Sequence, residues 1–296
     1  MGPRPVAVVT GAARGIGLET ARRLAPSHRV ALLDLDAAGA ERGAAEIGAD
    51  AVWAACDIAD PESVRAAVAD VTERCGGVDV AIANAGIATA GALRHLDPDV
   101  LAAQLNVNLL GSWRFIHACL PHVIERRGYV LGVSSASALV APPGLGHYAA
   151  SKAGLEHLLD VLRVEVAHLG VGVGVAFFSW IDTDMVRGGD RRHPAFGGLR
   201  AGLRGPAARV LPVGAAADAI VRAVHRRERT TVAPGFVRAA YLLRGLIGPL
   251  ADRDARRHAR AIDRATAEMV AARGAFDAAM APGEPGTAAA ARSVRG

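Results

Sequence analysis

The chain has 296 residues, of which 51% are apolar but only 4% aromatic, so it can bury a large core made mainly of Ala, Val and Leu. Its net charge is +5, and the basic runs are interleaved with acids, which is typical of solvated helix faces and argues against a nucleic-acid partner. Three scattered cysteines do not suggest a disulfide framework or a metal site. Cysteines this few and scattered are typical of a reduced cytosolic setting, so we expect a cytoplasmic protein. No window approaches the ~18 continuous apolar residues of a membrane span.

Short apolar runs alternate with longer helical patterns along most of the chain. The expected strands are 5–10, 29–34, 51–55, 79–83, 129–134, 171–178 and 230–233, and the expected helices are 15–26, 37–47, 61–75, 98–126, 147–169 and 213–227. Asp60-Pro61 and Asp97-Pro98 are helix-start signals, because Asp caps free N–H groups and Pro fits the first turn. Repeated strand–helix units predict an α/β fold, a doubly wound parallel sheet of about seven strands.

A glycine-rich turn follows the first apolar run at once and opens the first expected helix. Glycines let the backbone come close to a pyrophosphate, and the helix start offers free N–H groups and the positive end of the helix dipole. A plain strand-to-helix turn would not need three glycines, so this turn predicts a Rossmann-type dinucleotide site. The residues expected to bind the cofactor here are Gly11, Arg14, Gly15, Ile16 and Gly17.

Asp34 ends the second expected strand, seventeen residues after Gly17. A carboxylate at this place can accept hydrogen bonds from the adenosine ribose hydroxyls and repels a 2′-phosphate, which favours NAD over NADP. Asp36, two residues on, is interpreted as a helix cap. Arg14 is the contrary signal, because a guanidinium near that ribose could hold a phosphate, so NADP stays open as the second cofactor.

Tyr148 and Lys152 stand four residues apart on an expected helix, and Ser135 lies thirteen residues upstream of Tyr148. Residues i and i+4 share a helix face, so the ammonium is expected to favour the phenolate and to lower a pKa that starts near ~10. The three residues predict an acid–base group with an orienting hydroxyl.

Neighbouring side chains offer alternatives for these roles. Ser134 or Ser137 could supply the hydroxyl, but the spacing to Tyr148 favours Ser135, and Ser134 is expected to satisfy backbone groups at the strand end. His147 adjoins Tyr148, and adjacent helical residues do not share a face, so it is interpreted as a pocket wall.

Together these motifs resemble the short-chain dehydrogenase/reductase family over about residues 5–235. The resemblance implies further site residues, in the family's order. They are Asp57 and Ile58 at the adenine, Asn84, Ala85 and Gly86 beside the cofactor, Asn108 as a fourth catalytic residue, and Thr183 at the nicotinamide carboxamide. Asn106, close to Asn108, is interpreted as a structural hydrogen-bonder.

The resemblance also implies roles and a reaction. Tyr148 would exchange a proton with the substrate oxygen, Ser135 would orient that oxygen, and Lys152 would lower the pKa of Tyr148 and hold the nicotinamide ribose, so that Tyr148 and Lys152 also contact the cofactor. Asn108 would position a water. The expected function is an oxidoreductase acting on CH–OH groups, which transfers a hydride between a nicotinamide cofactor and a hydrophobic secondary alcohol or ketone. No metal is expected.

One departure from the family pattern concerns the nicotinamide face. Phe178-Ser179 stands where the family usually has Pro-Gly, and it cannot reproduce both the fixed φ and the glycine freedom of that pair. The departure weakly favours the alternative function, a non-catalytic NAD(P)-binding protein with a regulatory or interaction role. The intact Ser135, Asn108, Tyr148 and Lys152 argue against it.

The carboxyl-terminal part departs from the strand–helix rhythm. Residues 183–212 are expected to form a mobile loop over the site, 236–281 a helical extension of the 1–235 domain, and 282–296 a disordered tail. The extension carries an apolar patch. We expect this patch to pack against the substrate pocket or another subunit rather than to contact a membrane surface. Gly245, Gly248 and Pro249 are expected to interrupt its helix.

The two longest expected helices, 98–126 and 147–169, carry more apolar residues than one sheet face needs. The examples are Leu155, Leu158, Leu159 and Leu162. Equivalent helices pair across a two-fold axis in the family, so the resemblance implies a homodimer or homotetramer.

Overall fold

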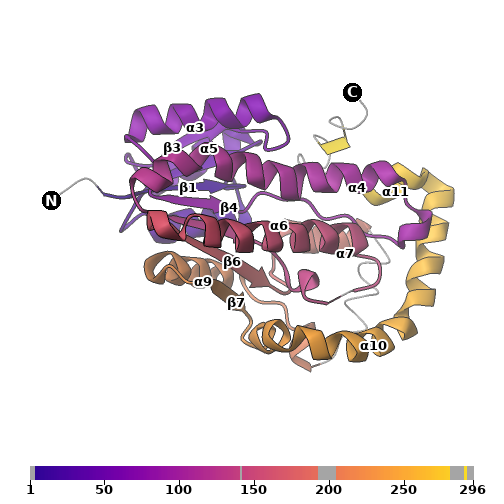
Figure 1. Cartoon of the computed structure of the whole chain (residues 1–296). Coiled ribbons are helices and arrows are strands. Elements are labelled where there is room, and N and C mark those ends of the chain that lie inside the picture. Colours follow the sequence, from indigo (N-terminus) through magenta and orange to yellow (C-terminus); the bar gives the residue numbers. More distant parts are fainter. Residues whose placement is uncertain (1–3, 141, 193–204, 281–289, 292–296) are drawn as a thin grey trace.

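The computed structural model of the chain describes residues 4–140, 142–192, 205–280 and 290–291 (Figure 1). Within them, seven parallel strands form one sheet in the order β3-β2-β1-β4-β5-β6-β7. The strands are β1 Val6–Thr10, β2 Arg29–Asp34, β3 Val52–Ala55, β4 Val80–Ala83, β5 Tyr129–Val133, β6 Gly172–Phe178 and β7 Thr230–Ala233. The order reverses between β1 and β4, which opens a crevice at the carboxyl ends of these two strands.

Helices cover both faces of the sheet. One face carries α1 Gly15–Leu24, α2 Ala37–Ile47 and α9 Val213–Arg226, and the other carries α3 Pro61–Cys75, α4 Pro98–Leu105, α5 Ser112–Glu125 and α6 Gly146–Glu165. Successive strand residues serve opposite cores: Val8 packs into one and Val9 into the other. This explains why the strands read as continuous apolar runs rather than alternating ones.

The predicted α/β class is confirmed, and every strand lies within one residue of its expected bounds. The two Asp-Pro starts also cap their helices as predicted. The Asp60 carboxylate accepts a 2.9 Å hydrogen bond from the Glu62 N–H, and Asp97 accepts one of the same length from Asp99. Short helical turns complete the fold: η1 Leu93–His95, η3 Ala136–Ala138, η4 Ala167–Leu169 and η5 Gly205–Ala208.

The expected single helix over 98–126 is wrong in one detail. A π-helical turn, η2 Asn106–Gly111, stands between α4 and α5. The Arg114 guanidinium bonds the Asn106 side-chain oxygen at 2.8 Å, so Asn106 is structural, as expected. Gly111 allows the close approach of this turn to the chain after β3, since a Cβ there would lie 2.7 Å from the Ile58 carbonyl oxygen.

The segment after β6 has more structure than the expected loop. It forms α7 Asp184–Arg192, and Ile181 makes an isolated parallel bridge to Leu211, which ties the two ends of the segment together. The middle of the expected loop, residues 193–204, lies outside the described residues. The expected tail, 282–296, also lies outside the described residues, apart from 290–291. Ala290 is buried in the core that α3–α6 share.

The extension forms α10 Phe236–Arg273 followed by α11 Ala275–Met280. The expected interruption at Gly245, Gly248 and Pro249 is wrong, because α10 runs through all three. It is bent, as expected where a proline removes an N–H from the helical ladder. Figure 1 shows α10 starting beside β7 and curving past the end of the sheet at which the strands finish, to reach α4 and α11.

The first turns of α10 divide their apolar residues between inside and outside. Val237 is fully buried, and the Tyr241 ring packs 5.3 Å from the Phe177 ring. Leu242 and Leu246 are instead 71% and 74% exposed. Among the described residues, no helix has both the length and the apolar content to cross a membrane.

Candidate active site

The glycine turn, residues 11–17, joins β1 to α1 and is locked by close backbone packing. Gly11 and Gly15 have φ values of +66° and +55°, which favour glycine. A Cβ on Gly17 would lie 2.2 Å from the Gly11 carbonyl oxygen. The Asn84 amide donates to the Thr10 and Gly11 carbonyls at 2.9 and 3.2 Å, which fixes the turn to the end of β4.

The start of α1 suits an anionic group such as a pyrophosphate. Arg14 occupies the N-cap position, and it forms no side-chain cap bond to the helix. The N–H groups of the first turn are therefore left for a ligand, and the glycines clear the space above them. Ile16 is partly buried against the core on that face of the sheet. The residues present thus fit a dinucleotide.

Asp34 lies at the end of β2 beside this turn. Its carboxylate accepts 2.9 Å hydrogen bonds from the Ala13 and Asp36 N–H groups, one on each oxygen. Asp36 caps α2 by accepting from the Gly39 N–H at 2.9 Å, as expected. Arg14 is exposed. Asp34 is therefore held against the turn that the dinucleotide would occupy.

Asp57 and Ile58, which the sequence predicts at the adenine, follow β3, the strand next to β2. The Asp57 carboxylate accepts from the Ala59 N–H at 2.9 Å, which holds the chain in a turn. Ile58 is 8% exposed and packs in the core with Val64 and Val107. The structure therefore places both residues at the same edge of the sheet as Asp34.

Gly86 brings the end of β4 against the next group of side chains. A Cβ at Gly86 would lie 3.0 Å from Asn108 Oδ1 and 3.3 Å from Lys152 Nζ. Lys152 is 4% exposed and donates to the Val133 carbonyl at 2.8 Å. Ala85 N–H bonds the Thr10 hydroxyl at 3.1 Å. The structure thus brings Asn84, Ala85 and Gly86 between the glycine turn and the lysine.

Asn108 is fully buried in the π-helical turn, and its side chain is fully engaged. Its Oδ1 accepts from the Ile87 N–H at 2.8 Å, and its Nδ2 donates to the Ile87 carbonyl and the Ser151 hydroxyl, each at 2.9 Å. It therefore ties the chain after β4 to the helix that carries Tyr148 and Lys152. π-helical turns frequently occur at functional sites.

Two buried polar residues in this network were not predicted from the sequence. Gln104 donates to the Ile87 carbonyl and accepts from the Thr89 hydroxyl at 2.7 Å. Ser151 lies between Tyr148 and Lys152 and donates to the Tyr148 carbonyl at 2.8 Å. A serine inside a helix that carries two candidate site residues was the one feature of the sequence that could have indicated it.

Tyr148 and Ser135 meet at the carboxyl end of β5. The Ser135 hydroxyl bonds the Tyr148 oxygen, and the Lys152 Nζ lies 5.8 Å from the centre of the Tyr148 ring. Burial raises the pKa of the Tyr148 phenol above its ordinary value, and the Ser135 bond acts in the opposite direction. Burial also lowers the pKa of Lys152 to about 8.

The expected lowering of the Tyr148 pKa is therefore wrong for this structure. The physical reason is the position of the ammonium, which bonds the Val133 carbonyl and lies over the ring rather than at the phenol oxygen. Desolvation therefore determines the direction of the Tyr148 pKa shift, and the Ser135 bond opposes it only in part. The Ser135 bond is what favours the phenolate here.

The alternatives around Tyr148 separate by their partners. Ser134 donates to the Lys152 carbonyl at 3.0 Å, as expected for a residue that satisfies backbone groups. The Ser137 hydroxyl is buried without a partner among the described residues. His147 is buried, which lowers its pKa and keeps it neutral at ordinary pH. Ser135 is thus the hydroxyl that bonds Tyr148.

Thr183 and the Phe178-Ser179 pair follow β6. The Thr183 methyl group would lie 3.7 Å from a Cβ at Gly15, which places Thr183 above the glycine turn. Phe178 is buried, and the Ser179 N–H donates to the Ala233 carbonyl at 3.0 Å. Where the family has Pro-Gly, this chain therefore continues the pairing with β7 by one more bond. No group of His, Cys, Asp and Glu in the described parts of the chain is arranged to hold a metal ion.

Comparison with known proteins agrees with this geometry. Residues 5–193 match the family model described as short chain dehydrogenase. The chain belongs to the short-chain dehydrogenase family. An uncharacterized NAD-dependent oxidoreductase of Mycobacterium tuberculosis is 34% identical over 200 residues, which cover 61% of this chain and 73% of the relative.

Two further relatives carry more specific names. The 2-(R)-hydroxypropyl-CoM dehydrogenase of Xanthobacter autotrophicus is 35% identical over 191 residues, 62% of this chain and 76% of that protein. A crystal structure of the 3-ketoacyl-(acyl-carrier-protein) reductase of Brucella melitensis complexed with NADH aligns with a TM-score of 0.69 and 28% identity, over 78% of this chain and 95% of that one.

The family assignment makes this chain an oxidoreductase that transfers a hydride between a nicotinamide cofactor and an alcohol or ketone. The alternative, a short-chain dehydrogenase fold without a reaction, is not supported.

Proposed function

We propose that this short-chain dehydrogenase uses NAD to interconvert an apolar secondary alcohol and its ketone, with Tyr148 as the group that exchanges a proton with the substrate oxygen. The observation that carries the proposal is the partly buried Tyr148 phenol, bonded by Ser135 and lying beside the buried Lys152 ammonium. A phenol whose oxygen accepts a hydrogen bond from Ser135 keeps its own proton for the substrate, so it is a suitable general acid for a carbonyl oxygen.

Each neighbouring residue has a distinct task in this proposal. Bound NAD supplies the hydride acceptor of the oxidation. Ser135 orients the substrate oxygen against Tyr148 and stabilises the charge that develops on it. Lys152 holds positive charge close to the ring. Asn108 is a positioning residue. Its bonds to Ile87 and Ser151 fix the distance between the end of β4 and the helix of Tyr148.

The proposed cofactor contacts follow the same geometry. Gly11, Gly15 and Gly17 let the pyrophosphate approach the start of α1, where Arg14 and Ile16 flank it. Asp34 holds the adenosine ribose, Asp57 and Ile58 border the adenine, and Asn84, Ala85 and Gly86 shape the floor. Thr183 lies opposite the glycine turn, on the nicotinamide side. Tyr148 and Lys152 complete the nicotinamide end.

The proposed NAD preference rests on Asp34. Its carboxylate is fixed to the glycine turn, so a 2′-phosphate on the ribose would meet a like charge there. We expect a preference for NAD of about tenfold or more in kcat/KM, which corresponds to only ~1.4 kcal/mol. Asp34→Asn should shrink this ratio, measured as steady-state kinetics with both cofactors.

Asp36→Asn is the matched control for that change. It removes one carboxylate two residues away, and Asn is an equally good helix cap, so the ratio and the stability should both stay near those of the wild type. Wild-type kinetics that are equal or better with NADP would show that Arg14, and not Asp34, decides the choice.

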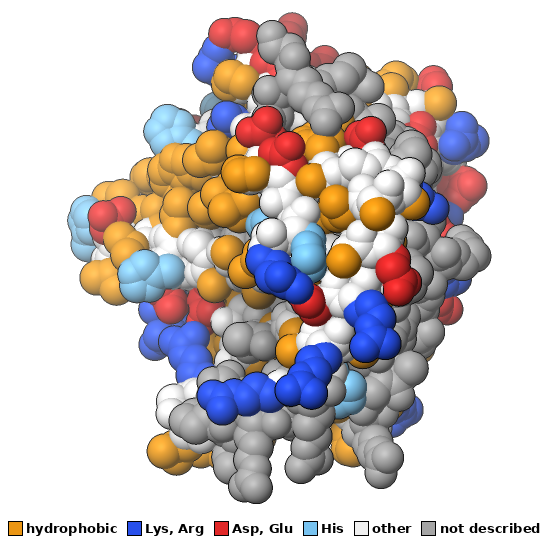
Figure 2. All heavy atoms as spheres, turned by 90° about the vertical axis from the view of Figure 1, so that its right-hand side faces the viewer, with side chains coloured by type: hydrophobic (Ala, Val, Ile, Leu, Met, Phe, Trp, Pro, Cys, Tyr) orange, Lys and Arg blue, Asp and Glu red, His pale blue; other side chains and the backbone are white. Residues whose placement is uncertain are grey.

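We also propose that the chain associates with copies of itself through the outer side of α5 and α6. The four leucines of α6 that were expected to be available for such a contact are not. Leu155, Leu159 and Leu162 are buried within the chain, and Leu158 is partly buried against the core. The exposed large apolar residues near this side are Leu110, at the end of η2 just before α5, and Val161 and Val164 on α6, at 46%, 47% and 72%. Figure 2 shows a broad hydrophobic patch on its left, the side of α5 and α6.

Light scattering at micromolar concentration tests the self-association. The wild type should have the mass of two or four chains, and Val164→Glu should lower it by placing a charge in the contact. Leu242→Glu, on the exposed side of α10, is the control and should leave the mass unchanged. A wild-type mass equal to one chain would rule out the proposed association.

A further inference from the structure

The second half of α10 joins a small apolar cluster at the carboxyl end of the sheet. Ile262 is 3% exposed and packs with Ala90 and Leu145, which are equally buried. Four partly buried residues surround them: Ala92, Trp180, Val186 and Ala265. We call these seven residues the α10 cluster. It contains no charged side chain.

Apart from α10 itself, every segment that supplies this cluster also supplies a residue of the candidate active site. Ala90 follows Gly86 and Ile87 on the chain after β4. Leu145 precedes Tyr148 by one turn of the same helix. Trp180 and Val186 stand on either side of Thr183. The α10 cluster therefore lies next to the three segments that carry Gly86, Tyr148 and Thr183.

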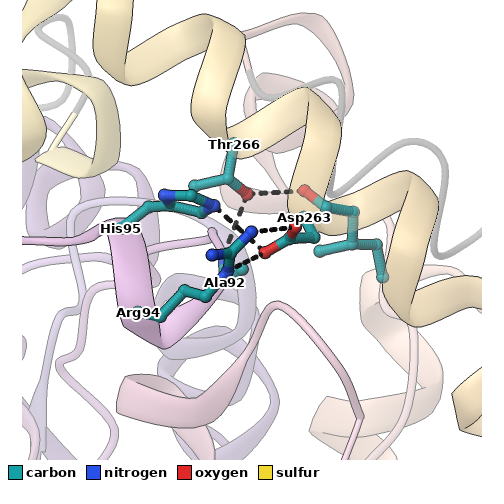
Figure 3. Close-up of polar contacts among 6 residues, drawn as sticks. Ala92, Arg94, His95, Asp263 and Thr266 are labelled. Carbon is teal, nitrogen blue, oxygen red and sulfur yellow. Dashed lines mark hydrogen bonds and ion pairs between the residues drawn. The ribbon is translucent and has the colours of Figure 1, made fainter.

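A set of polar contacts fixes Ile262 at this place (Figure 3). The Arg94 guanidinium bonds both oxygens of Asp263, at 2.6 and 2.5 Å, and His95 bonds one of them at 3.0 Å. The Thr266 hydroxyl, fully buried, accepts from the Ala92 N–H at 2.9 Å and donates to the Ile262 carbonyl at 2.7 Å. We call these contacts the η1 clasp, because Arg94 and His95 belong to η1.

The chain beneath Ile262 accommodates it closely. Gly144 has a φ of +82°, and a Cβ there would lie 3.0 Å from the Ile262 Cγ2. The Gly144 carbonyl accepts a 2.8 Å bond from the Gly91 N–H, so two loops of the site meet at this point. Ile262 thus lies on a rigid surface formed by the loops that precede η1 and α6.

We propose that α10 forms one wall of the substrate pocket and that Ile262, held by the η1 clasp, determines which hydrocarbon substituent of the alcohol or ketone fits. The inference rests on the proposed function and adds a substrate class to it. Because the side chains of the α10 cluster are apolar, a wall formed by them favours an alkyl or ring substituent over a charged one. Arg94 and Asp263 are positioning residues.

Ile262→Ala tests the wall directly. The probe is a series of straight-chain 2-alkanols of increasing length, assayed with NAD. Removal of the Ile side chain enlarges the pocket, so kcat/KM for the longest alcohols should rise relative to the shortest by on the order of tenfold. The affinity for NADH should not change, since α1 and the glycine turn are untouched. Leu242→Ala, which shortens an exposed residue of the same helix, should leave the length profile unchanged.

A second variant tests the positioning role of the η1 clasp. Asp263→Ala should raise KM more than it changes kcat, and it should speed hydrogen exchange of the α10 backbone around residue 262. The exchanged pair Arg94→Asp with Asp263→Arg should restore both. An unchanged KM together with unchanged exchange would overturn the positioning role.

A binding measurement separates this inference from the proposed function. Thermal stabilisation of the NADH-loaded protein by the matching 2-alkanones reports the pocket without turnover. If the wild type binds the ketones but turns none of them over, the proposed reaction is wrong. The binding data still test the role of Ile262 in that case. If the length profile of binding is the same in the wild type, Ile262→Ala and the milder Ile262→Val, the proposed role of Ile262 is wrong.

Discussion

Tyr148→Phe is expected to lower kcat by on the order of 10²–10⁴-fold in both directions, the usual contribution of a general acid–base group. The phenol is the group in the proposed site that exchanges a proton with the substrate oxygen, and Ser135 bonds that same phenol oxygen. The ring itself survives in Phe, so the packing beside Lys152 should persist. Steady-state kinetics and a fluorescence titration with NADH measure the two quantities separately.

The dissociation constant of NADH should stay within a few-fold of the wild type in that variant. Tyr241→Phe is the matched control, because it makes the same chemical change on α10, where the ring packs on Phe177 outside the proposed site. It should keep nearly full activity. A Tyr148→Phe enzyme that retained more than about a tenth of the wild-type rate would remove Tyr148 from the mechanism.

Gly17→Ala is expected to have the second large effect, on cofactor binding. The new Cβ would lie 2.2 Å from the Gly11 carbonyl oxygen and 2.8 Å from Asn84 Nδ2. The first of these is backbone, so the turn itself must move, and overpacking of this kind costs about 1–3 kcal/mol. The N–H groups at the start of α1 would be displaced, and NADH binding should weaken by on the order of 10–100-fold.

Gly245→Ala is the control for the glycine change. Gly245 lies inside α10, and apart from its chain neighbours and the adjoining backbone of that helix no described atom lies within 4 Å of the position of a Cβ there, so Ala should be accommodated and can stabilise the helix by up to about 1 kcal/mol. Thermal unfolding and NADH titration of both variants distinguish the two sites. Wild-type affinity for NADH in Gly17→Ala would contradict the assignment of the glycine turn.

The fold could be predicted from the sequence because the local sequence signals and the final packing agree. The apolar runs form strands that are buried on both faces, and Asp60 and Asp97 cap the helices that their Asp-Pro pairs predict. The proposed catalytic residues could be predicted equally well, since Tyr148 and Lys152 share a helix and Ser135 follows the adjoining strand. These features depend on spacing along the chain, which a sequence shows directly.

The features that could not be predicted depend on contacts between distant segments. The π-helical turn at Asn108 has no local signature. The lysine ammonium bonds the Val133 carbonyl, so its effect on Tyr148 could not be judged from their spacing alone. The α10 helix continues through Pro249, because weak helix propensity was outweighed by packing at both of its ends. The pairing of Arg94 with Asp263 joins residues 169 positions apart.

The most direct test of the proposed reaction follows the hydride itself. Wild-type protein is incubated with NAD and a 2-alkanol that carries deuterium on its carbinol carbon, and the reduced cofactor is examined by mass spectrometry. The proposed function predicts deuterium in the NADH formed by the wild type and almost none formed by Tyr148→Phe. Reduced cofactor without deuterium, or none formed from any alcohol of the series by a protein that binds NADH, would contradict it.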